Sequence, residues 1–199
     1  EAANDDSGTS VALSDDGTIL AVGAPINDGA FGSSDNRGHV RIYQWDGSSW
    51  NQVGQDIDGE ASTDQSGRAV SLSGDGTVMA IGQLGDYNYN DMISRVKVYN
   101  VVNGTLSPRG ADFEGAPTGD MFGTSISLNV DGTVIAIGAP NKEFNDSNKG
   151  HVKVYEFVNS NWTQVGLTLE GEVSNDRFGQ SVSFNDAGTI MAIGAPYND

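Results

Sequence analysis

The 199-residue sequence has no cysteine, only 10 basic residues and no long hydrophobic run. The lack of cysteine excludes disulfides and thiolate metal sites, neither of which a β-rich fold of this size requires. The 27 acidic residues give a net charge of −17, and such a surface repels phosphate backbones and anionic lipid. No segment reaches the 18 or so consecutive apolar residues that a membrane-spanning helix needs. We therefore expect no nucleic-acid partner and no insertion into a membrane.

Turn-forming residues are abundant instead, with 27 glycines among many aspartates, asparagines and serines. This composition argues against a helix-rich fold, because these residues favour turns and interrupt helices. The hydrophobic fraction of 37% is nevertheless high enough to form a packed core. The composition therefore predicts a folded protein rich in tight turns.

A glycine-marked unit recurs along the chain with a period of about 57 residues. Each marking glycine follows an aspartate by three residues. The same sequence pattern comes after it, with small residues alternating with apolar ones, then a glycine turn and an apolar run. The glycines are Gly8, Gly67, Gly123 and Gly179. The expected units are residues 1–59, 60–115 and 116–171, followed by a half unit at 172–199.

Four strands are predicted in each complete unit, because apolar residues alternate at period two between turn signals. In the first unit they lie around residues 10–13, 19–23, 39–43 and 50–54, and Asp16-Gly17 marks a hairpin between the first two. In the second unit the fourth strand contains Pro108, which favours an edge position. The gradient from small inner to polar outer strands is typical of an all-β propeller, with a β-solenoid as the rival fold.

Two short motifs resemble the FG-GAP repeat family. Phe122-Gly123 is followed by Gly138-Ala139-Pro140, and Phe178-Gly179 is followed by Gly194-Ala195-Pro196. The resemblance implies blades like those of the integrin α-subunit propeller and an extracellular or cell-surface location. It also implies a non-catalytic role in protein binding, adhesion or structural assembly. The family's calcium-binding loop does not carry over, because residues 14–18 are too few to wrap the six to eight oxygens that calcium prefers.

The aspartates that precede the marking glycines are Asp5, Asp64, Asp120 and Asp176. The simplest prediction is that they accept backbone N–H bonds in the connection between one unit and the next. The alternative is that they bind calcium together with carboxylates of the loops, namely Asp28, Asp91 and Asp146. Comparing the melting transition with and without a chelator distinguishes the two.

Catalytic signatures are absent from the sequence. His39 and His151 occupy one repeat position, where the second unit has Arg95, so their place in the repeat explains them better than catalysis does. No nucleophile elbow and no His-Glu-x-x-His motif occurs. We predict that the chain is not an enzyme, while a propeller-fold hydrolase or lyase remains the least favoured alternative.

Binding surfaces are expected where the units differ most, in the loops at 26–37, 84–94 and 141–149. A protein or glycan ligand is predicted there. Trp50 and Trp162 share one repeat position, and if exposed they would favour a carbohydrate-binding propeller. Asn103, Asn145 and Asn161 are predicted glycosylation sites, since each begins an Asn-x-Ser/Thr sequon.

Three and a half units cannot close into a ring by themselves. A propeller of about four to eight blades removes its sheet edges by closure. The sequence therefore predicts either further repeats in a longer chain or assembly of copies into a homo-oligomer, as a ring or a filament.

Overall fold

The computed structural model describes residues 4–29, 35–85, 93–103, 105–116, 119–141 and 149–199. Within these ranges every regular element is a β-strand, and the all-β prediction is confirmed. None of these residues belongs to a helix that could cross a membrane.

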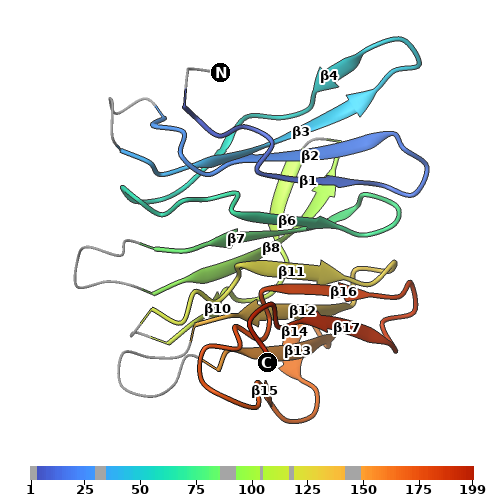
Figure 1. Cartoon of the computed structure of the whole chain (residues 1–199). Helices are drawn as coiled ribbons and strands as arrows, with labels where there is room; N and C mark the ends of the chain where they lie inside the picture. The colour runs from blue at the N-terminus through green and yellow to red at the C-terminus, as the bar shows by residue number, and fades with distance from the viewer. Residues whose placement is uncertain (1–3, 30–34, 86–92, 104, 117–118, 142–148) are drawn as a thin grey trace.

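Within the described residues, three antiparallel sheets of five strands and one two-stranded hairpin make up the fold (Figure 1). In the first sheet the strands follow the order β1-β2-β3-β4, and β5 is a second partner of β3. The next two sheets repeat this arrangement. The first sheet contains β1 (Ser10–Leu13), β2 (Ile19–Ala24), β3 (His39–Trp45), β4 (Trp50–Gln52) and β5 (Ile57–Asp58).

The remaining strands occur at equivalent repeat positions. The second sheet contains β6 (Ala69–Leu72), β7 (Val78–Gln83), β8 (Arg95–Val102), β9 (Thr105–Pro108) and β10 (Phe113–Glu114). The third contains β11 (Ser125–Leu128), β12 (Val134–Ala139), β13 (His151–Val158), β14 (Asn161–Gln164) and β15 (Leu169–Glu170). The hairpin consists of β16 (Ser181–Phe184) and β17 (Met191–Gly194).

The predicted fourth strand is broken into two, which corrects the expectation of a single strand at residues 50–54. β4 pairs with the end of β3 near Trp45, whereas β5 pairs with its beginning at His39 and Val40. Between them the chain turns at Gly54, whose φ of 77° favours glycine. Gly110 and Gly166 have the same conformation at the equivalent positions. Pro108 lies in β9 at the sheet edge, as predicted.

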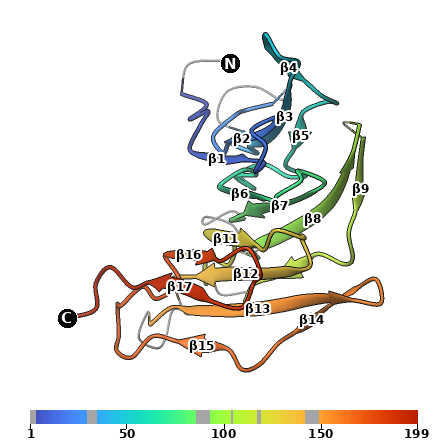
Figure 2. The same ribbon diagram turned by 90° about the vertical axis from the view of Figure 1, so that its right-hand side faces the viewer.

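The sheets stack face to face, so that each unit covers one face of the unit before it (Figures 1 and 2). The first core lies between the first two sheets and includes Ala21, Val40, Ile42, Met79 and Ile81. The second core lies between the second and third sheets and includes Val96, Val98, Phe122, Ile135 and Ile137. This explains the continuous apolar runs of β7 and β12, the second strands of the inner units, which are covered on both faces.

Hydrogen bonds between hairpin turns join successive units in one direction. The Asp15 amide donates to the Gly74 carbonyl at 2.8 Å, and the Gly74 amide donates to Val130 at 2.8 Å. The Val130 amide continues the series to the Asp186 carbonyl at 2.9 Å. The inner hairpins are thereby held at a fixed spacing, as a propeller-type array requires.

Both ends of the stack are open. In β1 the side chains of Val11 and Leu13 are 62% and 55% exposed, although the equivalent Ile126 and Leu128 are buried between units. At the other end Ile190 is 70% exposed, whereas its counterpart Val78 is buried. In the part of the chain that the structure describes, the fold is therefore an open β-propeller-type repeat array with exposed apolar side chains at both ends.

Candidate functional site

A pocket of about 310 Å³ opens at the junction of the second and third units. Its walls come from β10, from the connection that follows it, and from β13 and β15 of the next sheet. The residues that line it are Glu114, Gly115, Ala116, Asp120, His151, Lys153, Thr168 and Glu170. It lies at the small end of the volume range for ligand pockets, about 300–1,000 Å³.

Asp120 and His151 form the buried side of this pocket. The Asp120 carboxylate accepts the backbone amides of Ala116 at 3.0 Å and Phe122 at 3.1 Å. Nε2 of His151 lies 3.8 Å from Asp120 Oδ2. The carboxylate therefore holds the connection between units in place, with the imidazole beside it.

The other recurring aspartates have similar contacts. Asp64 accepts the amides of Glu60 at 2.8 Å and Ala61 at 2.9 Å. Asp176 accepts those of Glu172 at 3.0 Å and Val173 at 2.8 Å, and the hydrogen bond from Val173 lowers the pKa of its carboxyl. Asp5 accepts the Asn27 side-chain amide at 2.9 Å. The prediction of backbone hydrogen bonds is confirmed for Asp64, Asp120 and Asp176.

Calcium binding by these aspartates stays a prediction. In the part of the chain that the structure describes, no three histidines, aspartates or glutamates gather as ligands of one ion. Of the loop carboxylates named with them, Asp28 accepts the Asn36 amide at 3.1 Å, whereas Asp91 and Asp146 lie outside the described residues.

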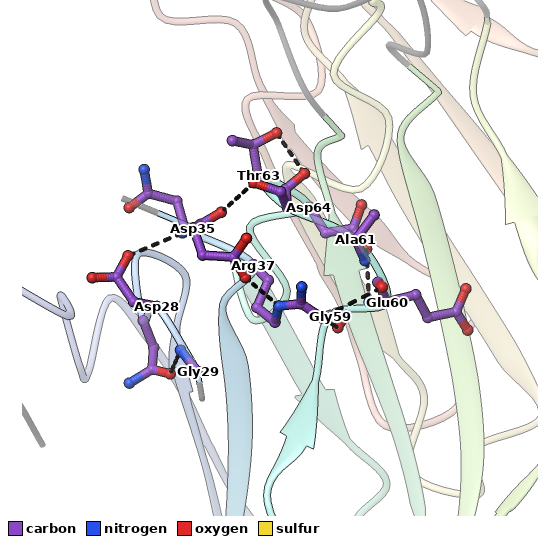
Figure 3. Close-up of polar contacts among 12 residues, drawn as sticks. Asp28, Gly29, Asp35, Arg37, Gly59, Glu60, Ala61, Thr63 and Asp64 are labelled. Atoms are coloured by element: carbon purple, nitrogen blue, oxygen red, sulfur yellow. Dashed lines mark hydrogen bonds and ion pairs between the residues drawn. The ribbon is translucent and has the colours of Figure 1, made fainter. Parts of the chain in front are cut away.

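The loop of the first unit is fastened to the connection that leads into the second (Figure 3). The Asp35 carbonyl accepts the Thr63 amide at 2.7 Å, and Arg37 Nη1 donates to the Gly59 carbonyl at 3.3 Å. Arg37 also forms an ion pair with the Asp35 carboxylate. The described parts of the predicted ligand loop, residues 26–29 and 35–37, are thus attached to the framework. Most of the loops at 84–94 and 141–149 lies outside the described residues.

A basic residue on the third strand of each unit has different partners in each unit. Arg41 forms two hydrogen bonds of 2.8 Å to Asp56. Lys97 pairs with Glu60 and lies 3.9 Å from Asp112. Lys153 makes no ion pair with any described residue, and its Nζ lies 5.6 Å from the centre of the Phe122 ring. This difference between the units could be found in the sequence only by aligning the three units residue by residue.

The two tryptophans at one repeat position differ in their surroundings. The Trp162 indole N–H donates to the Arg109 carbonyl at 2.7 Å, and its ring packs against Phe113 and Phe157. Trp50 is 41% exposed and lies beside Trp45, with ring centroids 5.5 Å apart. Trp162 is therefore a packing residue, whereas the Trp45–Trp50 pair lies at the outer edge of the first sheet.

The predicted glycosylation sites are placed in part. Asn103 is exposed in the turn that follows β8, and Asn161 is exposed as the first residue of β14. Asn145 lies outside the described residues. The exposed positions are accessible to modification, and glycosylation itself stays a prediction.

Comparison with known families finds a match at the junction of the second and third units. Residues 114–155 match the family model of the FG-GAP repeat. The match runs from β10 into β13 and includes Asp120, His151 and Lys153, so most of the residues that line the pocket lie within the matched stretch. The suspected resemblance to this family is confirmed.

Solved structures of other proteins resemble the fold over most of this chain. A proposed 6-phosphogluconolactonase from Bacteroides uniformis is 11% identical, with a TM-score of 0.61, over 92% of this chain and 46% of its own. A proposed TolB from Agrobacterium tumefaciens is 13% identical, with a TM-score of 0.49, over 92% and 56%. A hypothetical selenium-binding protein from Sulfolobus tokodaii is 12% identical, with a TM-score of 0.45, over 78% and 40%.

The chain spans about half the length of these solved structures. At such low identity the first of them supports the fold alone. No protein with a curated description matches the chain.

Proposed function

We propose that the chain is a non-catalytic binding and assembly module whose two open faces each receive a further repeat unit. The observation that carries this proposal is the exposure of Val11 and Leu13 at one end and Ile190 at the other. At the equivalent positions inside the stack, apolar side chains are buried by the neighbouring unit. Burying a valine or leucine contributes about 1.5–3 kcal/mol, so a matching face has a strong tendency to bind there.

The two faces complement each other because they repeat the contacts of the internal junctions. Residues equivalent to Ile190 lie against the turn glycine of the following unit, in the pairs Ile19–Gly76, Val78–Gly132 and Val134–Gly188. By the same geometry Ile190 would lie against Gly17 of a second copy. The resulting core would be formed by a face of this chain meeting the opposite face of another.

Polar groups at the two ends also match. The amides of Leu128 and Phe184 donate to Ser71 and Ser127 of the preceding unit, each at 3.0 Å. Ser183 occupies the same position in the last hairpin, where the Leu13 amide of a second copy would donate to its hydroxyl. The Asp186 amide and the Asp15 carbonyl stand at the two ends of the turn-to-turn series and would continue it.

The proposed location is extracellular or at the cell surface, with adhesion or structural assembly as the role. This rests on the resemblance of the units to the FG-GAP repeat. The repeated faces favour a homo-oligomer in which copies join head to tail. If the rotation between copies closes, the assembly is a ring, and if it does not close, the assembly is a filament. In a longer chain the same faces would receive further repeats.

Sedimentation velocity over a range of protein concentrations tests the stacking. We expect wild-type chains to form larger species, and Leu13→Asp or Ile190→Asp chains to stay monomeric. An equimolar mixture of the two variants should form a dimer and nothing larger, because only one intact junction remains. Leu167→Asp is the control, because Leu167 is 87% exposed and the residues at the same repeat position in the first two units, Gln55 and Ala111, are exposed as well. A wild-type chain that remains monomeric at high concentration would refute the proposal.

Carbohydrate binding is the second candidate, favoured by the exposed Trp45–Trp50 pair. An exposed aromatic ring can stack on the apolar face of a sugar. A glycan array should then show binding that is lost in both Trp45→Ala and Trp50→Ala. Binding that persists in these variants, or no binding to any glycan, would remove this candidate.

A further inference from the structure

We propose that the pocket at the junction of the second and third units binds a small carboxylate ligand, with Lys153 as its anchoring cation. The ligand supplies the negative charge that the first two units provide from their own side chains. This proposal does not depend on stacking, because the pocket lies within one chain.

The three units differ in the acidic partners of the basic residue on the third strand. Arg41 has Asp56 as its partner, and Lys97 has Glu60 and Asp112. At the repeat positions of these acids, the third unit has Thr168 in place of Asp56 and Asp112, and Ala116 in place of Glu60. The cation is kept, whereas both carboxylates are replaced by smaller uncharged side chains.

The two replacements leave a space in the third unit. Thr168 and Ala116 both line the pocket together with Lys153. The volume of about 310 Å³ is therefore found where the missing carboxylates would have stood, with Lys153 among the residues of its wall. A ligand carboxylate placed there can form a charge-assisted hydrogen bond with Lys153 Nζ.

The pocket around Lys153 also has acidic residues in its wall. Glu114 and Glu170 line the pocket as well, and the whole chain is strongly acidic. Acidic neighbours do not prevent a carboxylate from lying beside a cation in this fold. In the second unit Lys97 has two carboxylates beside it, those of Glu60 and Asp112, although Glu114 lies on the neighbouring strand β10. In the pocket, Glu114 already lies 3.6 Å from Arg95, and the Asp120 carboxylate accepts backbone amides.

These acidic walls also define the rest of the ligand. Carboxylates accept hydrogen bonds from hydroxyl and ammonium groups. The ligand class that fits both signs of charge is therefore a small acid that also carries donors, such as a hydroxy acid, a sugar acid or an amino acid. A neutral sugar could donate hydrogen bonds to these carboxylates but carries no anionic group for Lys153.

Calorimetric titration with sodium glucuronate and sodium glutamate, at constant ionic strength, tests the proposal, and glucose is the neutral comparison. We expect both acids to bind and glucose to show no binding. Lys153→Met should weaken binding of both acids at least tenfold, which corresponds to about 1.4 kcal/mol. Lys153→Arg should restore most of it, because the first unit uses Arg41 at this position.

Two further variants recreate the missing partner. Thr168→Asp and Ala116→Glu should each block the acids by pairing with Lys153 from within, and circular dichroism confirms that each variant is folded. Lys97→Met, at the same repeat position of the second unit, should bind the acids like the wild type. The proposal is overturned if neither acid binds, if Lys153→Met binds them unchanged, or if glucose binds as well as glucuronate.

Discussion

The carbonyl oxygen of Gly179 lies 2.1 Å from the point where Gly138 would carry a Cβ atom. The same relationship joins Gly82 to Gly123 at 2.3 Å and Gly23 to Gly67 at 2.2 Å. The glycine that marks the start of one unit therefore meets the glycine at the end of the second strand in the unit before it. Both halves of the FG-GAP motif thus require glycine because two backbones come into contact at this point.

Gly138→Ala should consequently destabilise the fold strongly. The new methyl group would overlap the Gly179 carbonyl and separate the third unit from the last hairpin, at a cost of about 3 kcal/mol. Chemical denaturation measures the change. Gly47→Ala is the control, because a Cβ there meets nothing within 4 Å and only the φ of 98° is strained. Equal midpoints for the two variants would contradict this explanation of the motif.

The period, the strand type and the role of the recurring aspartates could be read from the sequence, because turn glycines and alternating apolar residues have direct local causes. The division of the outer strand into β4 and β5 could not be predicted. It depends on the turn at Gly54, after which the chain pairs with the beginning of β3 instead of its end. Trp50 and Trp162 could not be told apart, because the Trp162 indole packs against Phe157 of its own unit and against Phe113, which comes from the second unit. The pocket at Lys153 depends on two replacements that are distant in sequence from the lysine.

Asp120→Asn should reduce the stability of the chain by about 1–3 kcal/mol. Asp120 is buried and accepts two backbone amides, and an asparagine would provide one acceptor oxygen and an amide group that repels the second N–H. Asp131→Asn is the matched control, because Asp131 is exposed, and we expect a change within about 0.5 kcal/mol. Denaturation midpoints that shift equally would refute a structural role for the Asp120 carboxylate.

Removal of calcium should leave the melting temperature unchanged. The carboxylates of Asp64, Asp120 and Asp176 are already occupied by backbone amides, which compete with a metal ion for the same oxygens. Melting in excess EDTA and in millimolar calcium measures the effect, with magnesium as a control for ionic strength. A rise of several degrees with calcium alone would establish the metal site and overturn this expectation, since a ligand that binds the folded state raises its stability.

Trp162→Ala should cost about 3–5 kcal/mol, whereas Trp50→Ala should cost less than about 1 kcal/mol. The Trp162 ring packs against the second core and its indole N–H donates to the Arg109 carbonyl, whereas Trp50 is 41% exposed beside Trp45. The two variants share one repeat position and one change of side chain, so each is the control for the other. Similar losses would mean that the first unit depends on Trp50 as the third depends on Trp162.

Acid should weaken the Arg41–Asp56 pair within a defined pH range. The hydrogen bonds from Arg41 lower the pKa of Asp56 from 3.8 to about 2. A carboxyl whose pKa is lower in the folded state adds stability above its unfolded pKa and loses that contribution as pH falls through the folded value. The stability difference between wild type and Asp56→Asn should therefore be constant above about pH 5, at about 1 kcal/mol, and should decline progressively between about pH 5 and pH 1. Urea denaturation at several pH values measures it, and Asp131→Asn should show no comparable decline. A difference that does not decline over this range would mean that Asp56 acts through packing, with its charge contributing nothing.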